Sequence, residues 1–456
     1  MKLGNCCKFV SLLLSLLISL TLLPSCVAIK NPNEPWLSGN DLLPETESTT
    51  AAPPFLEYTE IETSRGESEN GSDSDESSSS KEETESFEAD LSDIFSKGYT
   101  DPREVYITDV DGNAKNLICI YLESMETTYG SSMQKDGTNY IPNLTSLAET
   151  HTSFSNNEGL GGFVSLQGSG WTMGALLATT SGIPFLLAET GENSNNSLGR
   201  DGTFLDGVVT LGDILEYKGY NQEFLCGSKA SFGGRKTYFE VHGNYEIFDL
   251  QSARDQGYVA PDYDNGFWGI EDEILYEIAK DELKKLADGN APFNFTMLTV
   301  DTHHVGGYIC NICGDEYTTK LGNVVACADR QLADFVEWCM EQDFYEDSVI
   351  VIMGDHPRMD SQLVKGVDFF DRTMYNCFIN AAIEPEGDTK NRVFSSFDMF
   401  PSVLSAMGFE IKGDRLGLGT NIFSETPTIC EIYGLEAIEE AVSLPSDYYR
   451  EKFMLK

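Results

Sequence analysis

Three apolar stretches of the sequence each end in side chains that can bind a cation. These are Glu123 after residues 116–122, His303 after residues 293–300, and Asp355 with His356 after residues 348–353. Carboxylates together with an imidazole nitrogen suit Mn²⁺ or Mg²⁺, and Zn²⁺ is the alternative. Such a cation lowers the pKa of bound water from about 15.7 to about 7 and offsets the charge of a transferring phosphoryl group. These residue types therefore predict metal-assisted transfer chemistry.

A hydroxyl residue, Thr172, stands where such chemistry could use a nucleophile. It follows Gly168 and Gly170, which allow a tight turn, and it begins a predicted helix that ends at the Gly-Ile-Pro sequence 182–184. Free N–H groups and the positive dipole end at a helix start favour a nearby anion. Thr172 is therefore a candidate nucleophile toward a phosphoryl or sulfuryl group. The alternative is that Thr172 only caps the helix.

The elements that must position these residues follow from the hydrophobic pattern. The three stretches are apolar on both faces, which is typical of buried strands in a parallel sheet. A further strand and turn are expected at 221–227, and helices are expected up to about residue 150 and over 206–218, 268–287 and 324–342. This alternation predicts an α/β domain with a central, largely parallel sheet flanked by helices. Since parallel strands share one carboxyl edge, the candidate residues should converge there.

A glycine-flanked arginine, Arg235, lies in the sequence 231–236, which we interpret as a flexible basic loop. In so acidic a chain it is a candidate clamp for an anion, because a guanidinium binds phosphate oxygens in pairs. A solvated surface arginine is the alternative.

The chain carries 74 Asp and Glu against 30 Lys and Arg, a formal net charge of −44. This balance argues against nucleic acid as a partner, which would require a basic face. Residues 27–100 are rich in Ser, Glu and Asp, and we expect a disordered tether there, with a specific acidic binding motif as the alternative. The catalytic domain is expected over 101–425 and a C-terminal helical extension over 426–456.

The first 26 residues have the pattern of an export signal. Lys2 and Lys8 precede the apolar run 9–23, which is short for a membrane span. The run ends in a sequence similar to a bacterial lipobox, which predicts Cys26 as a lipidated residue; an uncleaved N-terminal anchor is the alternative. Either interpretation places the domain on the extracytoplasmic face of the cell membrane.

Three cysteines, Cys310, Cys313 and Cys327, are close in sequence. In an exported protein a disulfide among them is the favoured expectation. A zinc site is the alternative, since His303 and His304 are near.

Several of these segments together resemble the phosphoglycerol transferases, the group that contains lipoteichoic acid synthase, in the sulfatase-like branch of the alkaline phosphatase superfamily. The matching segments are 122–124, 172–174 with 181–184, 299–303, 354–356 and 415–419, and the resemblance covers about residues 104–425. The resemblance implies an alkaline phosphatase/sulfatase-like α/β fold. Sulfatases proper use a C/S-x-P-x-R motif, which residues 172–175 lack, so sulfate-ester hydrolysis is not expected.

The resemblance also implies roles for individual residues. Glu123, Thr172, Asp355 and His356 would hold one metal ion, most often Mn²⁺, with Thr172 as the covalently modified nucleophile. The glycerophosphate group would be held by Arg235 and His303.

The implied activity is transfer of glycerophosphate from phosphatidylglycerol, at a membrane surface, to a glycan or polyglycerophosphate (teichoic acid) acceptor. Phosphoethanolamine transfer and phosphodiester hydrolysis are the alternatives within the superfamily, and an inactive glycan-binding lipoprotein is the alternative outside it. The chain departs from the synthases in having one N-terminal segment where they often have several membrane helices. It also has Gly233 where they have an aromatic residue near the substrate arginine.

Overall fold

The computed structural model describes residues 91–109, 112–186 and 199–454. The expected signal, Cys26 and the acidic tether up to residue 90 lie outside these ranges. Within them, no helix has both the length and the apolar character to cross a membrane.

A six-stranded sheet carries the site. Its strands lie in the order β4 (Glu246–Phe248), β3 (Asn221–Cys226), β5 (Phe293–Leu298), β2 (Asn116–Leu122), β6 (Ser348–Gly354) and β7 (Asn376–Ile379). All neighbouring pairs are parallel except β6 and β7, which are antiparallel. The expectation of a largely parallel sheet is therefore confirmed, and β2, β5 and β6 follow the three apolar stretches.

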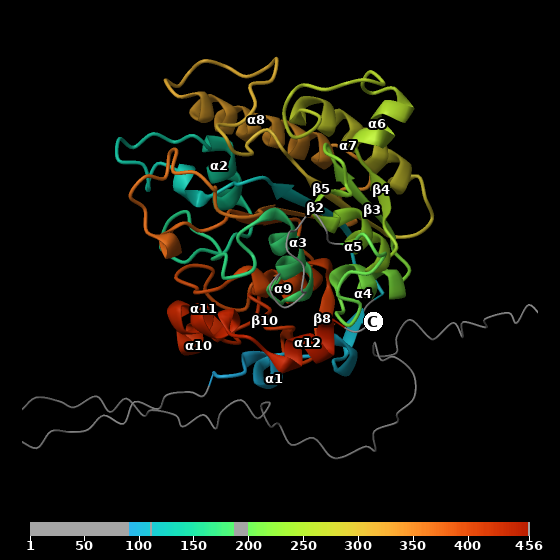
Figure 1. Ribbon diagram of the computed structural model, residues 1–456, viewed down its shortest axis with the longest axis vertical. Coiled ribbons are helices and arrows are strands. Elements are labelled where there is room, and N and C mark those ends of the chain that lie inside the picture. The colour runs from blue at the N-terminus through green and yellow to red at the C-terminus, as the bar shows by residue number, and fades with distance from the viewer. Residues whose placement is uncertain (1–90, 110–111, 187–198, 455–456) are drawn as a thin grey trace, which may run out of the picture. The chain divides into compact units, whose positions relative to one another are not determined.

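Helices cover both faces of the sheet (Figure 1). One face packs against α3 (Thr172–Ser181), α4 (Leu211–Tyr217), α5 (Arg235–Val241) and α9 (Met399–Met407), and the other against α2 (Pro142–Thr150), α6 (Leu250–Gln256), α7 (Asp272–Ala287) and α8 (Lys320–Met340). Successive side chains of β2 alternate between these two buried cores, for example Cys119 and Ile120. Burial on both sides explains why the strand sequences are apolar throughout.

The remaining elements lie around this framework. They are α1 (Ile94–Gly98), β1 (Ile107–Asp109) paired with β8 (Phe409–Ile411), β9 (Arg415–Leu416) paired with β10 (Gly419–Thr420), and α10 (Ile429–Tyr433), α11 (Leu435–Ser443) and α12 (Asp447–Phe453). The ring of Phe95 on α1 contacts that of Tyr449 on α12 with centroids 5.3 Å apart. The expected tether over 27–100 is therefore wrong at its C-terminal end. Ile94 and Phe95 of α1 are buried and belong to the folded domain.

Three helix boundaries differ from the prediction. The helix expected at 206–218 begins only at Leu211, because Thr210 and Asp213 form a reciprocal capping box. The helix expected from residue 268 begins at Asp272. The helix expected at 324–342 begins at Lys320, where Thr319 caps it, and ends at Met340.

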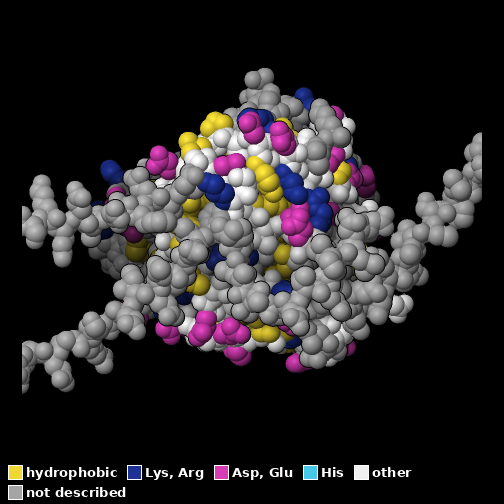
Figure 2. Space-filling model, turned by 90° about the horizontal axis from the view of Figure 1, so that it is seen from below, with side chains coloured by type: hydrophobic (Ala, Val, Ile, Leu, Met, Phe, Trp, Pro, Cys, Tyr) yellow, Lys and Arg dark blue, Asp and Glu magenta, His cyan; other side chains and the backbone are white. Residues whose placement is uncertain are grey.

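Acidic side chains are scattered over the face in Figure 2, with Lys and Arg side chains and apolar side chains between them. The negative charge of the folded part is thus spread over this surface.

Candidate functional site

Thr172 is the first residue of α3, and its side chain does not cap the helix. The N-cap position belongs to Trp171, which makes no capping hydrogen bond with its side chain. The Thr172 hydroxyl lies 3.3 Å from Nε2 of His356. The alternative of a capping threonine is therefore wrong. The hydroxyl stands at the positive end of a ten-residue helix.

The turn before α3 depends on one of its two glycines. Gly168 has φ +83°, and a Cβ there would lie 2.8 Å from Cβ of Pro184. Gly170 has neither a positive φ nor a close neighbour. The tight turn was expected to need both Gly168 and Gly170. Only Gly168 requires the conformational freedom of glycine. The helix ends as predicted, with Gly182 in the left-handed conformation.

Glu123, Asp355 and His356 bring their ligand atoms within 4.8 Å of one another. Nε2 of His356 lies 3.4 Å from Oδ2 of Asp355 and 3.6 Å from Oε1 of Glu123. All three side chains are buried. They follow β2 and β6, which are neighbours in the sheet. The carboxyl edge thus brings three of the predicted metal ligands together, with the fourth, Thr172, beside them.

The chemistry of this cluster fits a divalent cation. The ring nitrogen Nδ1 of His356 lies 2.9 Å from the carbonyl oxygen of Pro357. Donation to this carbonyl leaves the Nε2 lone pair directed at the carboxylates. Burial raises the pKa of Asp355 to about 7, and the charge of Glu123 adds to the shift. Oδ2 of Asp355 has no hydrogen-bond partner among the described residues. Two carboxylates, an imidazole nitrogen and a hydroxyl are a donor set for Mn²⁺, Mg²⁺ or Zn²⁺.

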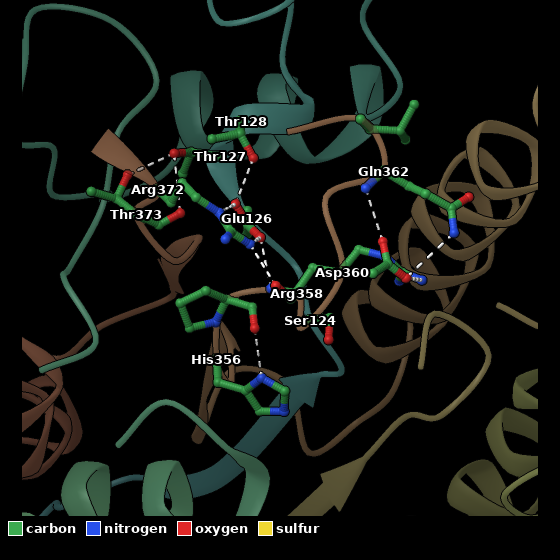
Figure 3. A network of polar contacts seen from close by, with 12 residues as sticks. Ser124, Glu126, Thr127, Thr128, His356, Arg358, Asp360, Gln362, Arg372 and Thr373 are labelled. Atoms are coloured by element: carbon green, nitrogen blue, oxygen red, sulfur yellow. Dashed lines mark hydrogen bonds and ion pairs between the residues drawn. The ribbon is translucent and has the colours of Figure 1, made fainter. Parts of the chain in front are cut away.

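A buried network holds the chain after His356 in place (Figure 3). Its centre is Glu126, which is fully buried, pairs with Arg372, and accepts from the backbone N–H of Arg358 at 2.7 Å. Nη1 of Arg358 donates to the carbonyl oxygen of Thr302 at 2.6 Å. The network therefore joins the segment after β6 to the segment after β5, which carries His303.

Arg235 is buried at the first position of α5, with 6% of its surface exposed. It donates to the carbonyl oxygen of Phe232 at 3.1 Å and to Oγ of Ser228 at 2.8 Å. The expected flexible loop is a short 3-10 turn, Phe232–Gly234, that runs into α5. The interpretation of Arg235 as a solvated surface residue is wrong, because its guanidinium is fixed by the backbone.

His303 lies against aromatic side chains that the sequence did not single out. Its ring centroid is 4.4 Å from that of Trp268, whose own ring is 5.9 Å from that of Phe232. Trp268 precedes α7 and donates to the carbonyl oxygen of His304 at 3.1 Å. Burial lowers the pKa of His303, which favours the neutral ring. Phe232 supplies an aromatic ring beside Arg235 even though its neighbour is Gly233.

One cavity of about 850 Å³ collects these residues, and its lining includes Glu123, Thr172, Arg235, His303, His304 and His356. Three further cationic side chains line it, Arg200, Lys229 and Arg254. These three residues could not be predicted from the sequence as part of the site, since isolated basic residues in separate segments give no local signal. Together with Arg235 they outnumber the two acidic residues of the lining, Glu123 and Asp264, and a net basic cavity in a strongly acidic chain suits an anionic ligand.

Asp355 does not line the cavity itself. Its Oδ2 atom lies 3.4 Å from Nε2 of His356, which does. The six predicted site residues are therefore brought to one edge of the sheet.

The prediction of a disulfide has a different outcome. Cys310, Cys313 and Cys327 converge, yet they are free thiols in the structure, and so the expected disulfide is not formed.

The sequence and the fold were compared with those of known proteins. A sequence model of the sulfatase family matches residues 115–409, and the chain belongs to that family. The phosphoglycerol transferase I of Xanthomonas euvesicatoria is 31% identical over 68% of this chain and 43% of the relative, and that of Salmonella choleraesuis is 28% identical over 74% and 42%. The chain thus spans less than half the length of these relatives. The resemblance inferred from the motifs is confirmed.

Two solved structures share the fold. An alkaline phosphatase superfamily protein from Vibrio parahaemolyticus aligns with a TM-score of 0.53 and 22% identity over 73% of this chain and 76% of that one. A lipoteichoic acid synthase from Listeria monocytogenes aligns with a TM-score of 0.52 and 22% identity over 68% and 76%. The expected alkaline phosphatase/sulfatase-like fold is therefore confirmed.

Proposed function

We propose that the chain is an exported, membrane-tethered phosphoglycerol transferase. It moves glycerophosphate from a phosphatidylglycerol-type lipid to a glycan or polyglycerophosphate acceptor through a covalent intermediate on Thr172. The observation that carries the proposal is the position of the Thr172 hydroxyl, at the start of α3, beside the cluster of Glu123, Asp355 and His356. The names of the relatives support the same activity, although this chain spans less than half of their length.

Glu123, Thr172, Asp355 and His356 would hold one cation, with Mn²⁺ as the expected ion, which would lower the pKa of the Thr172 hydroxyl and offset the charge of the phosphate. In the first half-reaction, Oγ of Thr172 forms a bond to phosphorus, and the bond from phosphorus to the diacylglycerol oxygen breaks. The hydroxyl proton of Thr172 ends on that oxygen, giving diacylglycerol. In the second, an acceptor hydroxyl attacks phosphorus, Thr172 leaves and regains a proton.

His303 is suited to carrying this proton. Its Nδ1 lies 2.6 Å from the carbonyl oxygen of His304, so donation there leaves Nε2 as an acceptor. Burial favours the neutral ring. His303 then accepts a proton before it donates one to the departing alkoxide, and so it acts as general base and general acid in turn.

The basic lining and the apolar rim of the cavity support an anionic lipid as donor. Arg235 and the cationic side chains beside it bind the phosphodiester. Exposed apolar residues stand around the same cavity, with exposed fractions of 43% for Phe232 and Trp268 and 64% for Met359. Their exposure suits contact with the glycerol backbone and acyl chains of a lipid at a membrane surface.

The alternatives make less use of these features. Phosphoethanolamine is zwitterionic, and its ammonium group gains nothing from four cationic side chains. Phosphodiester hydrolysis would use water as the acceptor in the second half-reaction. An inactive glycan-binding lipoprotein would have no need of the buried ligand set.

The test is incubation of the Mn²⁺-loaded protein with phosphatidylglycerol, followed by intact mass measurement and assay of diacylglycerol. We expect an adduct of one glycerophosphate residue on the wild type and none on Thr172→Ala. Phosphatidylethanolamine is the matched donor, and an adduct formed from it alone would replace the proposal by phosphoethanolamine transfer. Diacylglycerol release without an adduct on Thr172, at equal rates in Thr172→Ala, would refute the covalent mechanism.

A further inference from the structure

Outside the site, three thiols converge between a loop and a helix. Sγ of Cys310 lies 3.4 Å from Sγ of Cys313 and 3.6 Å from Sγ of Cys327, and the three sulfurs lie within 4.8 Å of one another. Cys310 and Cys313 belong to the loop after β5, and Cys327 belongs to α8. Cys310 and Cys327 are buried, and Cys313 is half-buried. The arrangement is a compact tris-thiol cluster.

The spacing matches ligands of one metal ion better than a disulfide. A disulfide would require two of the sulfurs to lie about 2.05 Å apart. In tetrahedral zinc–thiolate sites the metal–sulfur bond is about 2.3 Å, which places neighbouring sulfurs roughly 3.8 Å apart. The observed separations of 3.4 and 3.6 Å are close to that tetrahedral edge. A disulfide would also leave a third thiol beside it without a function, whereas a metal uses all three.

The surroundings also favour thiolates and a cation. The side-chain amide nitrogen of Gln331 lies 3.4 Å from Sγ of Cys327 and 4.0 Å from Sγ of Cys310, so it can donate toward both sulfurs. Asp301 is buried, and neither of its carboxylate oxygens has a hydrogen-bond partner among the described residues. Its charge and that of Cys310 repel each other. A cation at the thiols would compensate the charge of the three clustered thiolates.

We propose that Cys310, Cys313 and Cys327 bind one structural Zn²⁺, separate from the cation of the catalytic cluster. Binding releases the three thiol protons and forms three zinc–sulfur bonds, and a water molecule completes the tetrahedron. The loop from Thr299 to Thr319 contains neither helix nor strand. The zinc ties this loop to α8, and the loop carries His303.

The experiment measures metal in the full chain after dialysis against metal-free buffer. Elemental analysis should give about one zinc per chain in the wild type, as expected of a site with thiolate ligands. The same content is expected in His356→Ala, which lacks a catalytic ligand, and in Cys339→Ser, a matched control for a buried cysteine of α8 outside the cluster. Cys310→Ser and Cys327→Ser should lose the zinc.

X-ray absorption at the zinc edge provides a test that needs no folded cysteine variant. In the His356→Ala protein it should show sulfur neighbours at about 2.3 Å, whereas nitrogen and oxygen ligands would lie at about 2.0–2.2 Å. In that same background, a chelator should lower the melting temperature, and zinc should restore it. Zinc without sulfur neighbours, a zinc content indifferent to Cys310→Ser and Cys327→Ser, or a cysteine pair recovered as a disulfide by non-reducing peptide mapping would each overturn the proposal.

Discussion

The hydroxyl oxygen of Thr172 lies 3.3 Å from Nε2 of His356, although the two residues are 184 positions apart in the chain. One begins a helix and the other follows the strand β6. Their contact places the proposed nucleophile beside the candidate metal ligands, because the same nitrogen also faces Asp355 and Glu123.

The Thr172→Ala variant should lose turnover while it keeps its stability. Loss of a nucleophile lowers activity by several orders of magnitude. Since Thr172 does not occupy the N-cap, the change in melting temperature should correspond to less than about 1 kcal/mol. Diacylglycerol release and thermal unfolding measure the two effects in one preparation. Near-normal release with a clearly lowered melting temperature would return Thr172 to a structural role.

Replacing a catalytic ligand should remove one bound Mn²⁺. His356→Ala deletes the imidazole nitrogen that faces both carboxylates, so the Mn²⁺ content of the reconstituted protein should fall from about one equivalent to near zero. His151→Ala, which changes a histidine outside the cluster, is the control. Equal Mn²⁺ content in both variants would show that the cation is held elsewhere.

The Glu126→Gln variant should damage the site without touching a ligand. The neutral amide leaves the half-buried Arg372 without its counter-charge, a loss of at most about 3 kcal/mol, the lower end for a broken buried pair. It also weakens the anchor of Arg358. We expect a lower melting temperature and a 10- to 100-fold weaker affinity for Mn²⁺, as for residues that orient metal ligands. Unchanged Mn²⁺ affinity would limit Glu126 to a role in stability.

Stability should fall as the pH rises, because of Glu223 on β3. Burial raises its pKa to about 8, and the charges of Glu282 and Glu246 add to the shift. The folded state therefore binds this proton more tightly than the unfolded state, whose carboxyl titrates near 4.5. The contribution to stability is complete below about pH 4.5 and is lost as the pH rises to about 8, at about 1.4 kcal/mol for each pKa unit.

The Glu223→Gln variant should accordingly have a higher melting temperature than the wild type at pH 8. At pH 5 the two melting temperatures should differ little. Glu384→Gln is the control, because Glu384 is exposed and its charge does not contribute to the pKa shift of Glu223. Parallel pH profiles for the wild type and Glu223→Gln would contradict the assignment of the shift to Glu223.

Trp268→Ala should impair use of the lipid donor. The indole ring contacts His303 and is partly exposed at the cavity, so its loss removes apolar surface for lipid and frees the imidazole. We expect a raised KM for phosphatidylglycerol in vesicles and a lower kcat. Phe369→Ala removes an equally exposed aromatic ring that does not line this cavity. Matching kinetics for the two variants would show that the effect is not specific to the site.

The sequence could predict those parts of the site that depend on strand ends. Glu123, Asp355 and His356 follow apolar strands, and parallel topology alone brings their segments to one edge. The supporting residues have no such signal. Glu126 and Arg372 are 246 positions apart, and neither stands in a recognisable pattern. Their pairing depends on tertiary packing.

Boundaries were missed for a similar reason. Trp268 is apolar and adjoins a helical pattern, so its periodicity favoured α7, whereas the structure places it in the preceding loop beside His303. Local propensity describes what a residue can form. Whether an aromatic ring packs in a core or lines a cavity depends on neighbours that are distant in the chain.

The chain is strongly acidic, whereas its cavity is basic, and this charge distribution would exert a force before the protein touches a membrane. At the membrane surface of the proposed function, a chain with net charge −44 would be repelled by an anionic bilayer, while a cavity lined by Arg200, Lys229, Arg235 and Arg254 would be attracted to it. These opposing forces would exert a torque that turns the cavity toward the bilayer during approach. The torque fades beyond a Debye length, about 8 Å at physiological salt. The charge distribution would thus orient the protein only at short range, and this effect would weaken as salt is added.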